Sequence, residues 1–288
     1  MIYDCFTFFN ELELLEIRLN IMDPYVDKFV LVESTKTHQG QPKPLYFQEH
    51  QSVFSKFRDK IIPVVVEDMP AYNGSNSWEL EHFQRNAIGR ALKACSHQDK
   101  IILSDVDEIP NLSAIDLSNI DKNTLYIFRQ YMFYYYINCM NDTNDKNYRW
   151  HGSVLFHYSE KISPQTIRDF SLQTMGLYHH KWLHRLYWNI RKHITWQQFP
   201  LHLKFVENGG WHFSYLGGVD RIIQKLSAFA HTEYNTEEYK NPERIKQALE
   251  KGEDIFGRDF HYTFIPLNDI FPSYIIENQE KFQHLIKQ

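Results

Sequence analysis

Short apolar segments alternate with amphipathic ones along the first 110 residues of the chain. Four of the apolar segments have the length and the branched or aromatic composition of buried strands: Ile2–Phe9, Phe29–Val32, Ile61–Val66 and Ile101–Leu103. Three segments between them favour helices: Leu12–Leu19, Phe47–Phe57 and Leu80–Cys95. This alternation predicts an α/β fold with a mostly parallel, doubly wound central sheet flanked by helices.

Local signals mark the ends of several of these elements. Asn10 with Glu13, and Asn76 with Glu79, have the spacing of capping boxes, so a helix is expected to begin after each asparagine. Pro63 lies inside the third apolar segment, and proline has no backbone N–H to donate to a neighbouring strand. That strand is therefore expected at an edge of the sheet or with a bulge.

The pattern changes after Pro110. Three aromatic-rich segments predict strands: Leu125–Ile137 (one strand or a pair), Arg149–His157 (interrupted by Gly152) and Trp211–Tyr215. Residues 160–205 are expected to be irregular, and three helices are expected to follow: Val219–Ala230, Glu237–Lys251 and Ile270–Ile286. We find no repeat or linker, so residues 1–288 are expected to form one domain, with a nucleotide-binding half (1–110) and an acceptor-binding half with C-terminal helices (111–288).

Composition limits the possible function classes. The chain has 288 residues, 43% of them hydrophobic, so it can bury a core without a disulfide or a metal. Its net charge of −5 provides no basic field for nucleic acid. The three cysteines, Cys5, Cys95 and Cys139, form no C-x-x-C pair and fit a reducing compartment. With no signal-peptide pattern and no membrane-spanning segment, we expect a cytoplasmic protein, and a peripheral position at a membrane stays open.

The strongest chemical signal is Asp105-Val106-Asp107, which follows the apolar run Ile101–Leu103 and precedes Pro110. The carboxyl ends of strands in an open α/β sheet form the edge where ligands bind. Residues i and i+2 of an extended segment point the same way, so both carboxylates are expected to face one divalent cation. The alternative is an exposed acidic turn.

Two candidates elsewhere have chemistry that would complement these acids. Arg85 lies in the helix before that strand and carries the charge to bind a diphosphate. His212 lies on a short strand between two glycine pairs, next to Trp211, and its imidazole could be a third metal ligand. The alternatives are an ordinary surface arginine and a structural or exposed histidine.

Two further segments could contact a nucleotide sugar. Glu33 ends the second predicted strand at the same sheet edge, and could equally cap a loop. Gly152 permits close approach of a ligand, and Trp150 could stack on a sugar, although a bulged strand explains this segment equally well. The chain has no G-x-G-x-x-G, P-loop, G-x-S-x-G or H-E-x-x-H motif, which argues against dinucleotide dehydrogenases and P-loop kinases.

Four segments taken together carry a resemblance to a known family. They are residues 6–47, including Glu13-Leu-Leu-Glu-Ile-Arg-Leu19, then Ser104-Asp-Val-Asp-Glu-Ile-Pro110, Gly210-Trp-His-Phe-Ser-Tyr215 and Pro272-Ser-Tyr-Ile-Ile-Glu-Asn278. They resemble glycosyltransferase family 17, which includes the enzyme that adds the bisecting N-acetylglucosamine to N-glycans in β-1,4 linkage. The resemblance implies a GT-A-like (Rossmann-like) nucleotide-diphospho-sugar transferase fold, a UDP-sugar donor and inversion at the anomeric carbon.

Carried over residue by residue, the resemblance assigns expected roles. Asp105, Asp107 and His212 are the expected ligands of Mn²⁺ or Mg²⁺, with Asp107 central to catalysis. Among the expected nucleotide-sugar contacts, the resemblance carries over Arg85 and Asp105, whereas Glu33, Gly152 and Trp211 are expected from their own positions in the sequence. The expected reaction is the metal-dependent transfer of a sugar from a UDP-sugar to a hydroxyl of a glycan, glycolipid or glycoprotein acceptor. N-acetylglucosamine is the first expectation for that sugar.

The acceptor and the catalytic base are less well specified. Glu207, close to His212 in the sequence, is the expected base, and Asp220 is its rival. The chain is expected to lack the membrane anchor of the animal enzymes, and it has its own His- and Trp-rich segment, residues 179–212. Two other classes stay open, a nucleotide-sugar or glycan-binding protein without catalysis and a metal-dependent phosphoesterase.

Overall fold

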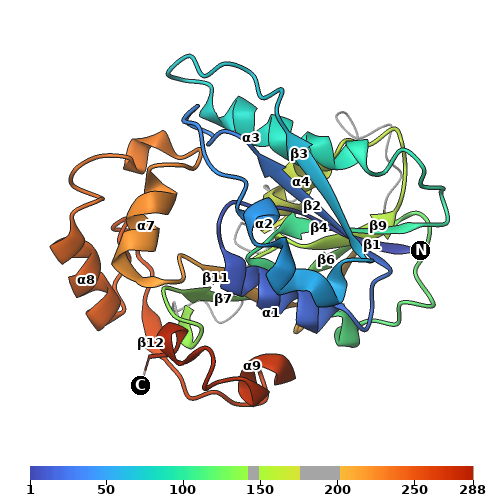
Figure 1. Cartoon of the computed structure of the whole chain (residues 1–288). Coiled ribbons are helices and arrows are strands. Elements are labelled where there is room, and N and C mark those ends of the chain that lie inside the picture. Colours follow the sequence, from blue (N-terminus) through green and yellow to red (C-terminus); the bar gives the residue numbers. More distant parts are fainter. Residues whose placement is uncertain (142–148, 176–201, 288) are drawn as a thin grey trace, which may run out of the picture.

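The structure, a computed structural model, describes residues 1–141, 149–175 and 202–287. A seven-stranded sheet lies at its centre, in the order β10-β6-β9-β4-β1-β2-β3 (Figure 1). Its strands are β1 (Ile2–Thr7), β2 (Lys28–Ser34), β3 (Ile61–Val66), β4 (Lys100–Asp105), β6 (Thr124–Phe128), β9 (Val154–His157) and β10 (His202–Val206). All neighbouring pairs are parallel except those that β9 forms with β4 and β6.

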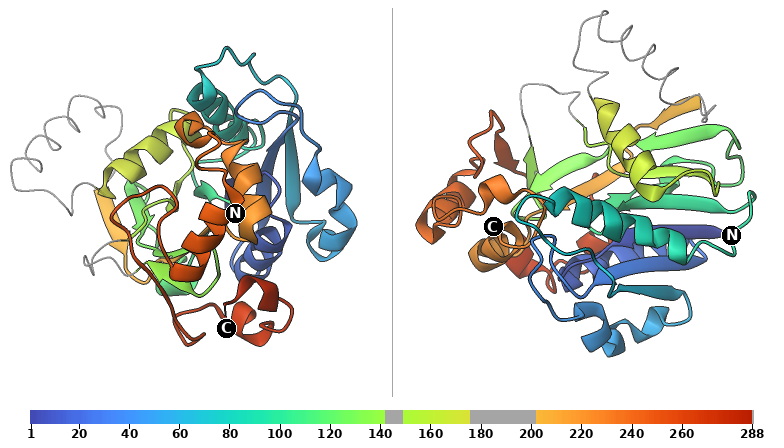
Figure 2. Two further views of the ribbon diagram at one scale, coloured as in Figure 1. Left: turned by 90° about the vertical axis from the view of Figure 1, so that its left-hand side faces the viewer. Right: turned by 90° about the horizontal axis from the view of Figure 1, so that it is seen from above.

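Helices cover both faces of this sheet because successive strand residues point to opposite sides. The helical segments before β4 are α1 (Leu12–Met22), α2 (Tyr46–Glu49), α3 (Ser77–Asn86) and the 3₁₀ turns η1 (Gln51–Phe57) and η2 (Ala87–Arg90). On one face, α1 packs on Phe6 and Phe29; on the other, η2 and α4 (Pro164–Gln173) pack on Val30 and Leu103. Figure 2 shows α3 and α4 on the side of the sheet opposite α1.

A second, five-stranded sheet lies beyond α1, in the order β12-β8-β7-β11-β5. Its strands are β5 (Glu108–Pro110), β7 (Tyr131–Tyr134), β8 (Cys139–Asn141), β11 (Gly210–Ser214) and β12 (Tyr262–Phe264). The helices α7 (Gly218–Leu226) and α8 (Pro242–Lys251) pack together beside it, and the short α9 (Ser273–Glu277) packs on α1. Since β5 begins three residues after β4 ends, the two sheets meet at the Asp105–Glu108 turn.

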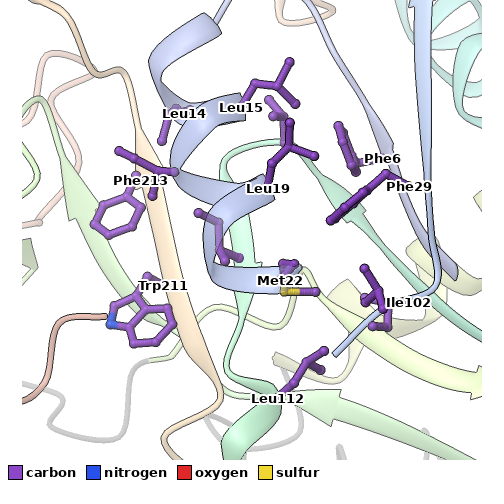
Figure 3. Close-up of a cluster of buried hydrophobic side chains, with 14 of the residues drawn as sticks. Phe6, Leu14, Leu15, Leu19, Met22, Phe29, Ile102, Leu112, Trp211 and Phe213 are labelled. Atoms are coloured by element: carbon purple, nitrogen blue, oxygen red, sulfur yellow. The ribbon is translucent and has the colours of Figure 1, made fainter. Parts of the chain in front are cut away.

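Helix α1 is buried between the two sheets (Figure 3). Its Leu15 and Leu19 are fully buried in a cluster that contains Phe29 from the central sheet and Trp211 and Phe213 from β11. Each fully buried side chain of this size contributes about 1.5–3 kcal/mol. The helix therefore ties the two sheets together directly behind the acidic turn.

The first half of the chain matches the prediction. The four expected N-terminal strands are present and parallel, with helical segments between them, which confirms the α/β fold. The strand that contains Pro63 is the edge strand β3, as expected. Among the described residues, no helix is both long enough and apolar enough to cross a membrane.

Several expected elements are wrong. Residues 160–205 were expected to be irregular, but Ser163 caps the helix α4 by accepting a hydrogen bond from the Thr166 backbone N–H; residues 176–201 of this segment lie outside the described residues. By contrast, the segment Leu125–Ile137 was expected to be one strand or a pair, and the pair is confirmed as β6 and β7, which belong to different sheets. The expected C-terminal helix is reduced to α9 and a 3₁₀ turn, η5 (Gln283–Leu285).

The expected starts and lengths of other helices are also corrected. Neither expected capping box forms: Glu11, not Asn10, precedes α1, and the Asn76 side chain accepts a hydrogen bond from Asn73 instead of capping α3. Helix α3 ends at Asn86, short of Cys95, and α8 begins at Pro242, after the expected start at residue 237. Proline favours the first turn of a helix, because its missing N–H has no partner there.

Candidate functional site

A pocket lies where the strand order of the central sheet reverses. Strands β2 and β3 lie on one side of β1, and β4 lies on its other side. The carboxyl ends of β1 and β4 therefore border a crevice. In open α/β sheets, this is where ligands bind. The pocket, about 720 Å³ including its part open to solvent, has walls from the residues after β1, the loop after β2, α3, the turn after β4, and α7 with the residues after it.

Arg18 of α1 sets the path of the chain after β4. Its side chain is fully buried and forms an ion pair with Asp4, with 2.6 Å between Nη2 and Oδ1. It also donates hydrogen bonds of 2.9 Å to the carbonyl oxygens of Asp105 and Glu108. Because a buried charge or carbonyl without a partner is costly, these contacts hold the acidic turn in one conformation.

Asp105 is surrounded by arginines. Its oxygens accept hydrogen bonds from Thr7 Oγ1 at 2.8 Å, Arg85 Nη2 at 3.1 Å and Arg168 Nη2 at 2.8 Å. Burial disfavours the ionised carboxylate, but the charges of Arg85 and Arg168 outweigh this and hold the pKa of Asp105 well below its ordinary value. Both oxygens of Asp105 are therefore already used by the protein.

Glu108 anchors the same arginine from the other side. Its carboxylate is buried and accepts two hydrogen bonds of 2.7 Å from Arg168, together with one from Trp150 Nε1 and one from the Asp105 backbone N–H. A Cβ atom at Gly152 would lie 2.2 Å from Glu108 Oε1. The glycine is thus required by the packing around Glu108, and its carbonyl also accepts a hydrogen bond from Arg168.

Asp107 has different partners. Its Oδ2 accepts a hydrogen bond of 3.0 Å from Lys225 Nζ, and His212 Nε2 lies 3.7 Å from the same oxygen. Burial disfavours its ionised form, but Lys225 and His212 outweigh this and hold the pKa of Asp107 well below its ordinary value. Burial likewise disfavours the charged Lys225, but Asp107 and Glu11 raise its pKa. Carboxylate and ammonium are therefore both charged at neutral pH.

The pairing of β11 with β5 places His212 beside this carboxylate. His212 lies opposite Glu108 in the antiparallel register, and the Phe213 backbone N–H donates a hydrogen bond of 2.8 Å to the Asp107 carbonyl oxygen. The imidazole stacks on Trp150, with ring centroids 4.8 Å apart and planes inclined by 27°. The tryptophan that was expected to stack on a sugar thus orients the histidine.

Asp107, Glu108 and His212 form a cluster of possible metal ligands, with one ligand atom of each within 4.8 Å of the others. Glu108 is occupied by Arg168, which leaves Asp107 and His212 as the pair able to hold an ion. Their separation of 3.7 Å is compatible with two ligands each about 2.1 Å from one ion. Asp105, the third expected ligand, is not part of this cluster.

Three expected nucleotide-sugar contacts do not line the pocket: Gly152, which packs against Glu108, and Glu33 and Trp211. Glu33 is buried behind it and binds Lys43 Nζ at 3.3 Å and the Phe47 backbone N–H; Lys43 itself lines the pocket. Trp211 points to the opposite side of β11 from His212, into the core shown in Figure 3, and donates a hydrogen bond of 2.6 Å to the Ile270 carbonyl oxygen. Alternation along β11 explains why only one of two neighbours reaches the site.

The two expected bases also lie outside the pocket lining. Glu207 is 64% exposed and pairs with Arg129, with 2.7 Å between Nη1 and Oε1. Asp220 is exposed in the first turn of α7, where a negative charge is favoured by the helix dipole. The acids that do line the pocket besides Asp105 and Asp107 are Glu11 and Glu81.

Sequence reasoning missed two basic residues of the site, Arg168 and Lys225. Arg168 lies on α4, in the segment expected to be irregular, although Ser163 followed by Pro164 is a helix-start signal. Lys225 lies in the last turn of α7, where a lysine is ordinary. No local pattern distinguishes a lysine that reaches across to an acid 118 residues earlier.

Comparisons with known proteins identify the family to which this chain belongs. The family model for glycosyltransferase family 17 matches residues 1–169. The chain is 30% identical over 107 residues to the human β-1,4-mannosyl-glycoprotein 4-β-N-acetylglucosaminyltransferase, and 30% and 29% identical to the rat and mouse proteins of that name. The match covers 35% of this chain and 20% of each relative. Because the family model spans more than half of the chain, the chain belongs to glycosyltransferase family 17.

Proposed function

We propose that this chain is a metal-dependent inverting glycosyltransferase with a GT-A-like fold that moves N-acetylglucosamine from UDP-N-acetylglucosamine to a hydroxyl of a glycan. The main support for the proposal is that Asp107 Oδ2 and His212 Nε2 lie 3.7 Å apart, beside the pocket where the strand order reverses. The family supports sugar transfer, and the relatives' name supports N-acetylglucosamine as the sugar. The chain matches only one fifth of those relatives' length, so their acceptor is part of the proposal.

Asp107 and His212 are the residues that would hold the divalent ion. An oxygen and an imidazole nitrogen together suit Mn²⁺, and the remaining positions are left for water and for donor phosphate oxygens. A bound ion supplies Lewis-acid stabilisation of the charge that develops on the departing UDP. Asp105 contributes indirectly in this proposal, because it fixes Arg85 and Arg168 around the turn that presents Asp107.

Lys225 is the residue we assign to the donor diphosphate. Its ammonium contacts Asp107 at 3.0 Å and lies 3.7 Å from Glu11, and it lines the pocket. Arg85 lines the same pocket, but Asp105, Glu81 and Gln165 already use its guanidinium. A lysine on a flexible stem can exchange one oxygen partner for another. If Asp107 held an ion, the Lys225 ammonium would be able to exchange this carboxylate for a donor phosphate oxygen.

In the reaction that follows, the acceptor hydroxyl oxygen forms a bond to the anomeric carbon as the bond from that carbon to the UDP oxygen breaks. The electron pair leaves with UDP, and the hydroxyl proton passes to a base. The anomeric carbon becomes cation-like, as in glycoside hydrolysis. Lys225, close to Asp107, is placed to stabilise the charge on the leaving group.

A donor screen tests the proposed function. UDP-N-acetylglucosamine, UDP-N-acetylgalactosamine, UDP-glucose and UDP-galactose are each supplied with Mn²⁺ and a mannosyl glycan, and UDP release is measured. We expect release with UDP-N-acetylglucosamine, loss of release with EDTA and recovery with added Mn²⁺. The proposal fails if no UDP-sugar releases UDP or shifts the melting temperature. Release of inorganic phosphate instead would identify a phosphoesterase.

The role of Lys225 has its own test. Lys225→Met removes one charged contact and is expected to raise the KM for the donor about tenfold or more. Lys251→Met, at the exposed end of α8, is the matched control and is expected to leave the KM unchanged. An unchanged donor KM in Lys225→Met would remove Lys225 from the donor site.

A further inference from the structure

An exposed tryptophan lies one helical turn before Glu81, a residue that lines the pocket. Trp78, in the first turn of α3, is 42% exposed, and the other large apolar residues exposed among those the structure describes are Met1 and Val53. Its indole N–H has no hydrogen-bond acceptor within the described part of the chain. Large apolar groups left at the surface next to a pocket commonly mark a binding site.

Other rings fix the position of Trp78. Its ring meets His231 edge to face, with centroids 4.5 Å apart and planes at 83°, and His82 lies 6.5 Å away on the same helix. The His231 ring is in turn held by a hydrogen bond of 2.6 Å between Nδ1 and Glu233 Oε1, and it packs on Phe229 at 5.3 Å. This aromatic patch, Trp78 with His231, is therefore ordered and partly open to solvent, since the His231 side chain is 41% exposed.

The aromatic patch is continuous with the pocket. Residues three apart on a helix are neighbours, and Glu81, one turn after Trp78, lines the pocket. On the other side, Phe229 also lines the pocket. A hydrogen bond of 2.7 Å from Ser77 Oγ to the Ala230 carbonyl oxygen ties the two sides together. A ligand that leaves the pocket in this direction therefore passes over Trp78.

We propose that Trp78 and His231 form a subsite for a pyranose ring of the acceptor glycan, a proposal that rests on the proposed function. An indole presents a flat apolar face to the C–H face of a sugar, and the indole N–H and the imidazole can bond its hydroxyls. Glu233 makes the patch unfavourable for a phosphate, whereas Lys225 and the Asp107–His212 pair provide for the diphosphate elsewhere. A neutral sugar ring is thus the ligand that matches these groups.

Saturation-transfer difference NMR tests the subsite in the presence of UDP and Mg²⁺, which is diamagnetic and does not broaden the ligand signals. The probes are methyl β-D-mannopyranoside, methyl α-D-mannopyranoside and methyl N-acetyl-β-D-glucosaminide. We expect a signal from at least one glycoside with the unchanged protein, retention of that signal in Trp78→Phe and its loss in Trp78→Leu, which keeps apolar bulk without an aromatic face. Val53→Ala, which truncates another exposed apolar residue, is the matched control and should keep the signal.

Kinetics with the same variants give the second readout. In Trp78→Leu we expect the KM for the glycan acceptor to rise about tenfold, with the KM for UDP-N-acetylglucosamine unchanged. No glycoside signal with the unchanged protein, or an unchanged acceptor KM in Trp78→Leu, overturns the subsite. A rise in the donor KM instead would assign Trp78 to the nucleotide and also overturn it. Failure of the proposed function is distinct, because UDP-N-acetylglucosamine would then not bind even to the unchanged protein.

Discussion

The acidic turn after β4 separates two regions with different character. On the arginine side, Asp105 and Glu108 hold Arg168 between them, and Arg85 adds a second guanidinium. On the open side, Asp107 contacts the Lys225 ammonium and lies beside the His212 imidazole, and Asp107 and Lys225 line the pocket. Acids that lie two residues apart in the sequence thus have separate tasks.

The reason for the difference is that the chain turns between the two acids. Asp105 is the last residue of β4, but Val106 and Asp107 form the turn to β5. An extended segment would direct both carboxylates to one ion, whereas the turn gives each its own partners. Fully satisfied guanidinium groups stabilise a conformation, and a lysine with a mobile stem permits exchange. The arginine side therefore supports the site, and the open side is suited to act on a ligand.

The largest effect is expected from Arg18, which underlies the arginine side. Arg18→Met leaves Asp4 as an unpaired buried charge, so the free energy of unfolding should fall by about 3–5 kcal/mol. Urea unfolding followed by circular dichroism measures the loss. The double variant Asp4→Asn with Arg18→Met removes the unpaired charge. It should therefore recover part of the lost free energy of unfolding. A single variant as stable as the original chain would show that this pair does not support the turn.

Asp107 tests the open side. Asp107→Asn removes the carboxylate that we assign to the ion, so UDP release should fall about 10³-fold. The free energy of unfolding should fall by only about 1–3 kcal/mol, because Lys225 loses one of its two acidic partners. The kinetics of UDP release measure the loss of activity, and calorimetry measures the binding of Mn²⁺. Full activity in this variant would contradict the division between the two sides.

A substitution at Gly152 tests how tightly the residues on the arginine side are packed. Gly152→Ala places a Cβ against Glu108 and Trp150 Nε1, and it should destabilise the protein by about 1–3 kcal/mol. Gly89→Ala is the matched control, because a Cβ there meets nothing within 4 Å, and it should change stability by less than about 1 kcal/mol. Thermal unfolding of both variants compares them, and equal melting temperatures would show that the region around Glu108 can adapt.

The smallest effect is expected where α7, which carries Lys225, meets α1. Arg221 pairs with Glu13 at 2.7 Å, but the two side chains are 40% and 27% exposed, so Glu13→Gln should cost only about 0.5 kcal/mol at pH 7. Partial burial opposes ionisation of Glu13, but the hydrogen bonds from Arg221 outweigh it and lower the pKa.

This pair also has an expected pH dependence. A folded-state pKa below the unfolded value means that the stabilisation is present above the unfolded pKa of about 4.3 and is lost as the pH falls through the folded pKa. The stability curves of the original chain and Glu13→Gln should therefore converge in acid. A gap that persists at low pH would show that the contact does not depend on charge.

The local pattern of the chain was enough to predict the frame of the site. Hydrophobic periodicity gave the four parallel strands, and Pro63 marked the edge strand, because each depends on residues close together in the sequence. The acids after an apolar run could be assigned to the carboxyl edge of the sheet for the same reason. His212 could be singled out by its glycine-bounded strand, and the structure brings it to Asp107.

The partners of those acids were decided by tertiary structure alone. Arg168 and Lys225 reach the acidic turn across 63 and 118 residues of sequence, and three-residue strands such as β5 carry too little pattern to be predicted. Which carboxylate is enclosed by arginines and which stays open depends on how α4 and α7 pack against that turn. Such long-range packing sets the burial and the charge around each group. These properties cannot be deduced from the residues next to that group in the sequence.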